Sequence, residues 1–152
     1  MILFMDKKIV ILVIIPIIGF IGFGWITDLS DEKVNSDEIV FHITLAEPEL
    51  YTNGVYTDKF LIESGTYFFR FVPNGSSPEI LSVKLIGQNF EMNENFKLIG
   101  IPHQSETAKY FTWEYDGNEK IVIDSSEEIS VHIDPNGNVN GSVSVDLIKI
   151  EA

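Results

Sequence analysis

The sequence predicts an all-β domain, an antiparallel β-sandwich of about eight or nine strands, preceded by one N-terminal transmembrane helix. Hydrophobic residues that recur with a period of two, and turn residues spaced roughly every 8 to 12 positions, predict the sandwich. An almost unbroken apolar run predicts the helix. We therefore expect four parts, which are a cytoplasmic N-terminus at 1–8, a transmembrane signal anchor at 9–26, a polar stalk at 27–38 and an extracytoplasmic β-sandwich at 39–152.

The apolar run at 9–26 has the length of a membrane span. Its 18 residues would form a helix of about 27 Å, which is close to the thickness of the hydrocarbon core of a bilayer. Lys7 and Lys8 precede the run, and Asp28, Asp31 and Glu32 follow it. Because positive charge favours the cytoplasmic side, we expect a single-pass protein of the cell membrane whose C-terminal domain lies outside the cell.

Two other interpretations of this segment stay open. A cleaved secretory signal would use the small residues of Gly22-Phe23-Gly24 as its cleavage site, although the sequence has no Ala-x-Ala there. The assembly helix of an archaeal-type pilin would be processed just after Lys8, although no Gly or Ala follows that residue. An uncleaved anchor fits the sequence best.

The strands of the outer domain are predicted from alternation, because side chains on a strand point to opposite faces in turn. Residues 27–38 are polar and aperiodic, as expected of a stalk. Beyond them, six runs carry apolar side chains at every second position, and we expect those side chains to face the core. They are Ile39, Phe41, Ile43 and Leu45; Tyr67, Phe69 and Phe71; Leu81, Val83 and Leu85; Phe111, Trp113 and Tyr115; Ile129, Val131 and Ile133; and Val143, Val145 and Leu147.

Residues that favour turns separate these runs. The aromatic density of 68–71 fits a thick core between two sheets, and an aromatic ligand-binding face is the alternative. The predicted turns are Asn53-Gly54, Ser64-Gly65, Pro73-Asn74-Gly75, Gly87-Gln88-Asn89, Asp116-Gly117-Asn118 and Asp134-Pro135-Asn136-Gly137.

Charge and composition exclude several classes of function. Residues 27–152 contain 22 acidic and 8 basic side chains, a formal charge of −14, and such a domain is repelled by nucleic acid. The chain has no cysteine, which excludes disulfides, thiolate nucleophiles and metal–thiolate sites. It also lacks the common catalytic and nucleotide-binding motifs. We expect no enzyme and no required cofactor.

Two weak metal-binding hypotheses can be formed from the sequence. His42 and His132 lie on the polar phase of their strands, and together with Asp134 they could bind a divalent metal if those strands were neighbours. Asp134, Asn136 and Asn138 offer side-chain oxygens at every second position, as a calcium loop does. However, Val139 and Val145 occupy the positions at which an EF-hand loop needs glycine and glutamate, which favours an ordinary hairpin turn.

Two glycosylation sequons occur in the predicted turns. They are Asn74-Gly75-Ser76 and Asn140-Gly141-Ser142, so Asn74 and Asn140 are candidate acceptors on an exposed, outward-facing domain.

The segment Glu63-Ser64-Gly65-Thr66-Tyr67-Phe68-Phe69-Arg70-Phe71 resembles the G-x-Y-x-F-x-F strand of GOLD-type (Golgi-dynamics) β-sandwich domains. The tail from Asp134 to Ile148 resembles that of small archaeal membrane-anchored proteins of unknown function. The resemblance implies a non-catalytic domain that recognises a partner. Eukaryotic GOLD proteins differ in having a C-terminal anchor and usually a cysteine pair.

We therefore expect a non-catalytic module that recognises or scaffolds another component of the cell envelope. A surface cation- or metal-binding domain and a pilin-like filament subunit are the alternatives.

Overall fold

The computed structural model describes residues 38–150, which belong to one compact unit. The predicted cytoplasmic N-terminus, the anchor at 9–26 and all of the stalk except residue 38 lie outside the described residues. Within residues 38–150, no helix is long and apolar enough to cross a membrane.

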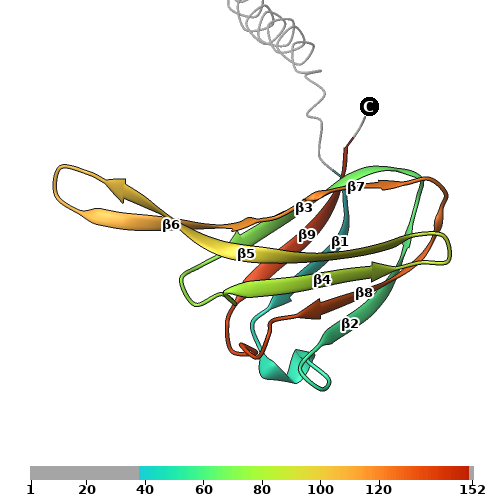
Figure 1. Ribbon diagram of the computed structural model, residues 1–152, viewed down its shortest axis with the longest axis horizontal. Coiled ribbons are helices and arrows are strands. Elements are labelled where there is room, and N and C mark those ends of the chain that lie inside the picture. The colour runs from blue at the N-terminus through green and yellow to red at the C-terminus, as the bar shows by residue number, and fades with distance from the viewer. Residues whose placement is uncertain (1–37, 151–152) are drawn as a thin grey trace, which may run out of the picture. The chain divides into compact units, whose positions relative to one another are not determined.

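Nine strands and one short 3-10 helix make up the described part of the chain, in agreement with the predicted eight or nine strands (Figure 1). In chain order they are β1 (Glu38–Leu45), η1 (Pro48–Leu50), β2 (Tyr56–Ile62), β3 (Gly65–Pro73), β4 (Ile80–Ile86), β5 (Glu91–Gln104), β6 (Lys109–Asp116), β7 (Lys120–Ile123), β8 (Glu127–Asp134) and β9 (Val143–Ile150).

The strands form two antiparallel sheets. One has the order β1-β9-β3-β7 and the other the order β2-β8-β4-β5-β6. Some neighbours come from distant parts of the chain, since β1 pairs with β9 and β2 pairs with β8, whereas β4, β5 and β6 follow one another directly. The prediction of an all-β sandwich is confirmed.

The core lies between the two sheets and contains most of the alternating residues. Five of the six predicted runs supply at least two fully or almost fully buried side chains each. In the run 67–71, the Phe71 ring contacts Phe96 and Tyr115 of the opposite sheet, with ring centroids 4.6 and 5.2 Å apart. This contact supports the core interpretation for Phe69 and Phe71, whereas Phe68 and Arg70 are not among the residues packed in the core. The buried members are Phe41 and Leu45; Tyr67 and Phe69; Leu81, Val83 and Leu85; Ile129, Val131 and Ile133; and Val143, Val145 and Leu147.

At the start of β1 the expected alternation fails. The pairing of β1 with β9 is irregular between Ile39 and Phe41, which is where a β-bulge shifts the phase of the strand. As a result Ile39 is 48% exposed, and Val40 packs against the core in its place.

The sixth run gives a second correction, because Phe111 and Trp113 were expected in the core and are exposed. β4 pairs with β5 only from Glu91 to Lys97, so residues 98–104 pair with β6 alone. The end of β5 and the start of β6 therefore form a two-stranded ribbon that extends past the rest of the sheet (Figure 1). We call this ribbon, residues 98–115, the arm. Only Leu98 and Tyr115, at its base, reach the core.

The six predicted turns all connect strands or bound them. Asn53-Gly54 and Asn136-Gly137 have positive φ at both residues, which asparagine and glycine tolerate better than other residues do. The turn at the tip of the arm was not predicted, because residues 105–108 contain neither glycine nor proline. There the Ser105 hydroxyl and backbone bond to Ala108.

Candidate functional site

The structure does not bring His42 and His132 together. His42 lies on β1 in one sheet and His132 on β8 in the other. The His132 ring is hydrogen-bonded to Thr57 at 3.3 Å and to Ser130 at 3.1 Å. Within residues 38–150 there is no group of three or more His, Cys, Asp or Glu side chains arranged to hold a metal ion. The condition for a shared histidine site, neighbouring strands, is not met.

The candidate calcium loop is held by its own side chains. The Asp134 carboxylate accepts a hydrogen bond from the backbone N–H of Asn136 at 2.7 Å. The Asn136 amide donates to Ile80 O at 3.0 Å, and the Asn138 amide donates to Ser76 O at 3.2 Å. Asp134, Asn136 and Asn138 thus hold a turn and tie it to β4 and to the β3–β4 loop. The turn is not the hairpin that the sequence favoured, because the strands it joins, β8 and β9, belong to different sheets.

The asparagines of both sequons, Asn74 and Asn140, are exposed and lie in neighbouring loops at one end of the sandwich. The Asn74 carbonyl oxygen accepts hydrogen bonds from the Ser76 backbone N–H at 2.8 Å and from its hydroxyl at 2.5 Å. The Asn74 amide donates to the Ser142 hydroxyl of the other sequon at 3.3 Å. Asn74 and Asn140 are therefore accessible, and a glycan on either would project from this same end.

A buried carboxylate lies on the outer face of the β1-β9-β3-β7 sheet. Asp146 is 4% exposed, and its register neighbours are His42 on β1 and Arg70 on β3. His42 Nδ1 lies 2.5 Å from Asp146 Oδ1, and Arg70 donates to Oδ2 from Nε at 3.0 Å and from Nη2 at 2.7 Å. Burial raises the pKa of Asp146, but the hydrogen bonds from His42 and Arg70 outweigh it and lower the pKa overall.

This three-residue network was not predicted. A carboxylate within the apolar run Val145-Asp146-Leu147 hints that a partner is needed, but the partners follow only from the strand order. The network links three strands of one sheet, so its role is structural.

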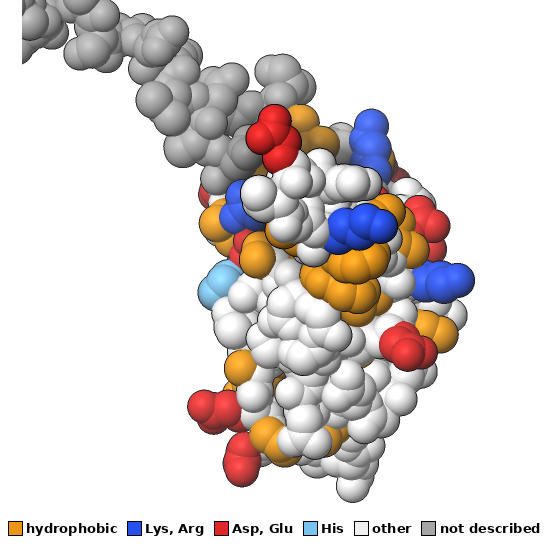
Figure 2. All heavy atoms as spheres, turned by 90° about the vertical axis from the view of Figure 1, so that its left-hand side faces the viewer, with side chains coloured by type: hydrophobic (Ala, Val, Ile, Leu, Met, Phe, Trp, Pro, Cys, Tyr) orange, Lys and Arg blue, Asp and Glu red, His pale blue; other side chains and the backbone are white. Residues whose placement is uncertain are grey.

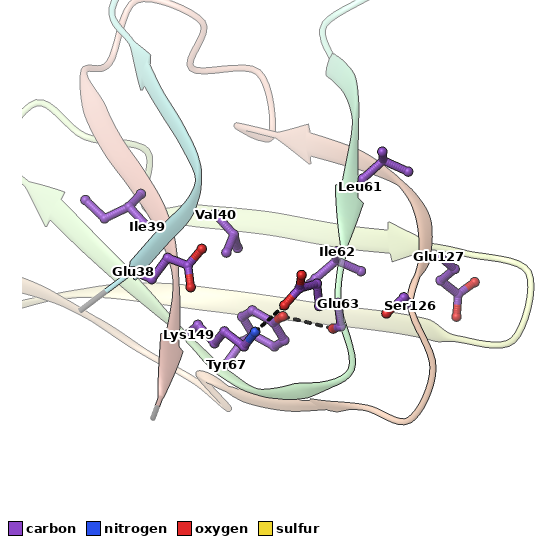
Figure 3. A pocket seen from close by; sticks show the side chains of 10 residues that line it. All are labelled: Glu38, Ile39, Val40, Leu61, Ile62, Glu63, Tyr67, Ser126, Glu127 and Lys149. Carbon is purple, nitrogen blue, oxygen red and sulfur yellow. Dashed lines mark hydrogen bonds and ion pairs between the residues drawn. The ribbon is translucent and has the colours of Figure 1, made fainter. Parts of the chain in front are cut away.

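A groove of about 650 Å³ opens between the edge strands β1 and β2 (Figure 3). Val40 and Leu61 lie on its two sides, and the Lys149–Glu63 ion pair, 2.6 Å from Nζ to Oε2, crosses it. Glu127, at its rim, is hydrogen-bonded to the backbone N–H groups of Gln88 and Asn89. Because these charges are already paired within the chain, the groove has few polar groups left with which to recognise a ligand.

The arm carries the most unusual surface among the described residues. Tyr110 is 53% exposed, Phe111 57% and Trp113 37%, and all three lie on β6. In Figure 2, which views the molecule from the side on which the arm projects, hydrophobic side chains gather near the middle of the face beside basic ones. Large aromatic side chains exposed together are typical of contact surfaces.

The arm is ordered by contacts along both of its faces. On the face that continues the core, the Trp113 ring covers Gly100, where an added Cβ would lie 3.0 Å from Cζ3. The Phe111 and Trp113 ring centroids are 6.1 Å apart. On the opposite face, His103 stacks on Tyr110 with centroids 5.0 Å apart, and its Nε2 lies 2.8 Å from the Thr112 hydroxyl oxygen. The exposed aromatic rings are therefore held in place before any partner binds.

Comparisons with family models, with curated proteins and with solved structures found no match for this chain. The arm, rather than any of the metal-binding candidates, is the feature from which a function can be argued.

Proposed function

We propose that this protein is a non-catalytic, membrane-anchored, extracytoplasmic β-sandwich that recognises or scaffolds another component of the cell envelope, and that the arm is its contact surface. The observation that carries the proposal is the exposure of Tyr110, Phe111 and Trp113 on a ribbon that extends past the opposing sheet.

An exposed two-stranded ribbon with aromatic side chains is unfavourable for a domain that acts alone. An isolated two-stranded hairpin is only marginally stable in water, and exposed aromatic side chains cost solubility. Tyrosine and tryptophan are also the residues most enriched at the energetic centres of protein interfaces. The arm therefore has the composition of a binding surface, and its ordered rings reduce the entropy lost on binding.

The sequence supports the cellular setting of the proposal. The apolar run at 9–26 suits a membrane anchor, with the acidic residues after it on the outer side. The resemblance of 63–71 to the GOLD-type strand points to the same class of non-catalytic recognition domain. The strongly acidic surface keeps the domain soluble and leaves the nearly neutral arm, which holds one lysine and two acidic residues, as the place of close approach.

The test is capture of partners from native membranes by the full-length chain. Phe111→Ser removes an exposed aromatic ring from the arm, and Val122→Ser removes a side chain of similar exposure, 54%, from β7. We expect the wild type and the Val122→Ser variant to recover the same envelope component after chemical cross-linking, and Phe111→Ser to recover at least about tenfold less, as loss of a central interface aromatic predicts. Equal recovery by all three would refute the role of the arm.

A further inference from the structure

The four edge strands of the two sheets differ in how well they are protected. An edge strand exposes unpaired backbone N–H and C=O groups, and proteins normally block such edges with bulges, charges, proline or short length. β1 has an irregularity next to Val40, β7 has four residues, and β2 has Asp58 and Lys59 at its centre. Each of these three edges carries a known protection against pairing.

β6 has no bulge and no proline, is not short, and carries its charges only towards its two ends. Its eight residues pair with β5 in an unbroken register from Lys109 to Asp116, and within residues 38–150 no other strand pairs with its second edge. The central residues 110–113, Tyr-Phe-Thr-Trp, are uncharged, exposed and of high β-propensity. This edge is open to another strand.

The charges of β6 select the direction in which a second β6 could pair. The strand begins with Lys109 and ends with Glu114 and Asp116. Parallel pairing in register would place Lys109 beside Lys109 and Glu114 beside Glu114, whereas antiparallel pairing separates these like charges. The antiparallel direction is therefore favoured for two β6 strands.

Register is selected by the aromatic side chains. If Thr112 of one copy lies opposite Thr112 of the other, Phe111 faces Trp113 on both sides of the centre, and Tyr110 faces Glu114. A shift to a centre at Phe111 would break both Phe111–Trp113 pairs and place Lys109 opposite Trp113. The two aromatic pairs therefore favour Thr112 as the centre.

We infer that the occupant of the arm is a second copy of this chain, and that two β6 strands pair antiparallel about Thr112 to join two five-stranded sheets into one. This inference rests on the proposed function and names the component that the arm binds. The interface is smaller than the roughly 1,600 Å² of a standard protein–protein interface, so the association is of moderate strength. Confinement of both copies to one membrane would strengthen it.

The absence of cysteine from the chain allows a direct test. Thr112→Cys and Thr57→Cys form a matched pair, because both threonines are exposed, lie on edge strands of the same sheet and contact a histidine. Directly opposed residues of antiparallel strands have Cβ atoms about 5 Å apart, which is close enough for a disulfide. With the full-length chain in detergent, we expect oxidation to cross-link Thr112→Cys and not Thr57→Cys.

Sedimentation of cysteine-free variants completes the test. We expect the wild type and Thr57→Lys to form a dimer, and Thr112→Lys, which places two ammonium groups at the centre, to sediment as a monomer. A monomeric wild type, equal cross-linking at both positions, or a dimer unaffected by Thr112→Lys would overturn the inference. If such a chain still captures a different envelope component in a way that depends on Phe111, the proposed function stands and only the second copy is excluded as its partner.

Discussion

Asp146 combines two properties that are costly together, since it is an ionisable side chain and is almost fully buried. The strand register offsets the cost of burying the carboxylate, because it places His42 and Arg70 directly across from Asp146 on the two adjacent strands. Hydrogen bonds to charged partners are stronger than neutral ones, and a buried charge without a partner is strongly destabilising. The network therefore ties the edge strand β1 to the two central strands of its sheet.

Replacing Asp146 by asparagine tests this account. The substitution keeps the shape of the side chain but removes the negative charge that faces Arg70, so we expect the free energy of unfolding at pH 7 to fall by about 2 kcal/mol. Urea unfolding followed by circular dichroism measures the change. Ser144→Ala, two residues earlier on the same face, is the control and should cost less, because the hydroxyl contact it loses, 2.8 Å to Thr44, is exposed.

The difference in unfolding free energy between wild type and Asp146→Asn should depend on pH. The pKa of Asp146 is lower in the folded state than its ordinary value of 3.8, so its contribution is complete above that value and is lost as the pH falls through the lower folded pKa. The difference in unfolding free energy between wild type and Asp146→Asn should therefore shrink when the pH is lowered below about 4. A difference that stays constant over this range would mean that the ionised carboxylate is not its source.

At the scale of the elements, the contacts that order the arm differ from those that order the sandwich. The core strands are fixed by burial between two sheets. The arm is fixed at its base, where the Leu98 N–H donates to Glu79 O at 2.8 Å and Tyr115 is buried, and further out it has mainly its own pairing. Further from the base, Trp113 contacts the sandwich, because its ring lies 3.3 Å from the position that a Cβ would take at Gly75 in the β3–β4 loop. The order of the arm should therefore depend on this side chain.

We expect Trp113→Ala to loosen the arm and leave the sandwich folded. Amide hydrogen exchange should become faster in residues 98–113, while protection of β4, β8 and β9 stays unchanged. Val122→Ala, which shortens an exposed side chain on β7, should alter exchange in neither region. Faster exchange throughout the domain would instead show that the arm and the core unfold as one cooperative unit.

The element scale also explains which features the sequence could predict. Alternation identified the buried faces at Leu81, Ile129 and Val145, because a face that packs against a sheet leaves a local period-two pattern. The same pattern placed Phe111 and Trp113 in the core, because alternation does not tell where the opposing sheet ends. The bulge at Val40 and the partners of Asp146 depend on strand order, which no local pattern contains. The arm itself left no local sign, because β5 contains Gly100 and Pro102 while its turn at 105–108 contains neither glycine nor proline.

For the whole molecule, the symmetry of the inferred contact decides between a dimer and a filament. Pairing of β6 with β6 uses the same edge on both copies, so it closes after two chains. A filament subunit needs two different surfaces that repeat without closing. The inferred pairing therefore favours an anchored scaffold of paired domains over the pilin-like alternative.

That scaffold requires the domain to lie outside the cell, and single cysteines can test this because the chain has none. Leu61 is 80% exposed, so a Leu61→Cys variant should react readily with a thiol reagent. With a membrane-impermeant maleimide, we expect Leu61→Cys to be labelled in intact cells and Asp6→Cys, in the segment predicted to be cytoplasmic, to be labelled only after lysis. Labelling of Leu61→Cys only after lysis would reverse the topology and remove the basis for an envelope partner. The mass of the labelled Leu61→Cys chain distinguishes an anchor from a cleaved signal. A labelled chain that has lost its first residues would support a processed N-terminus.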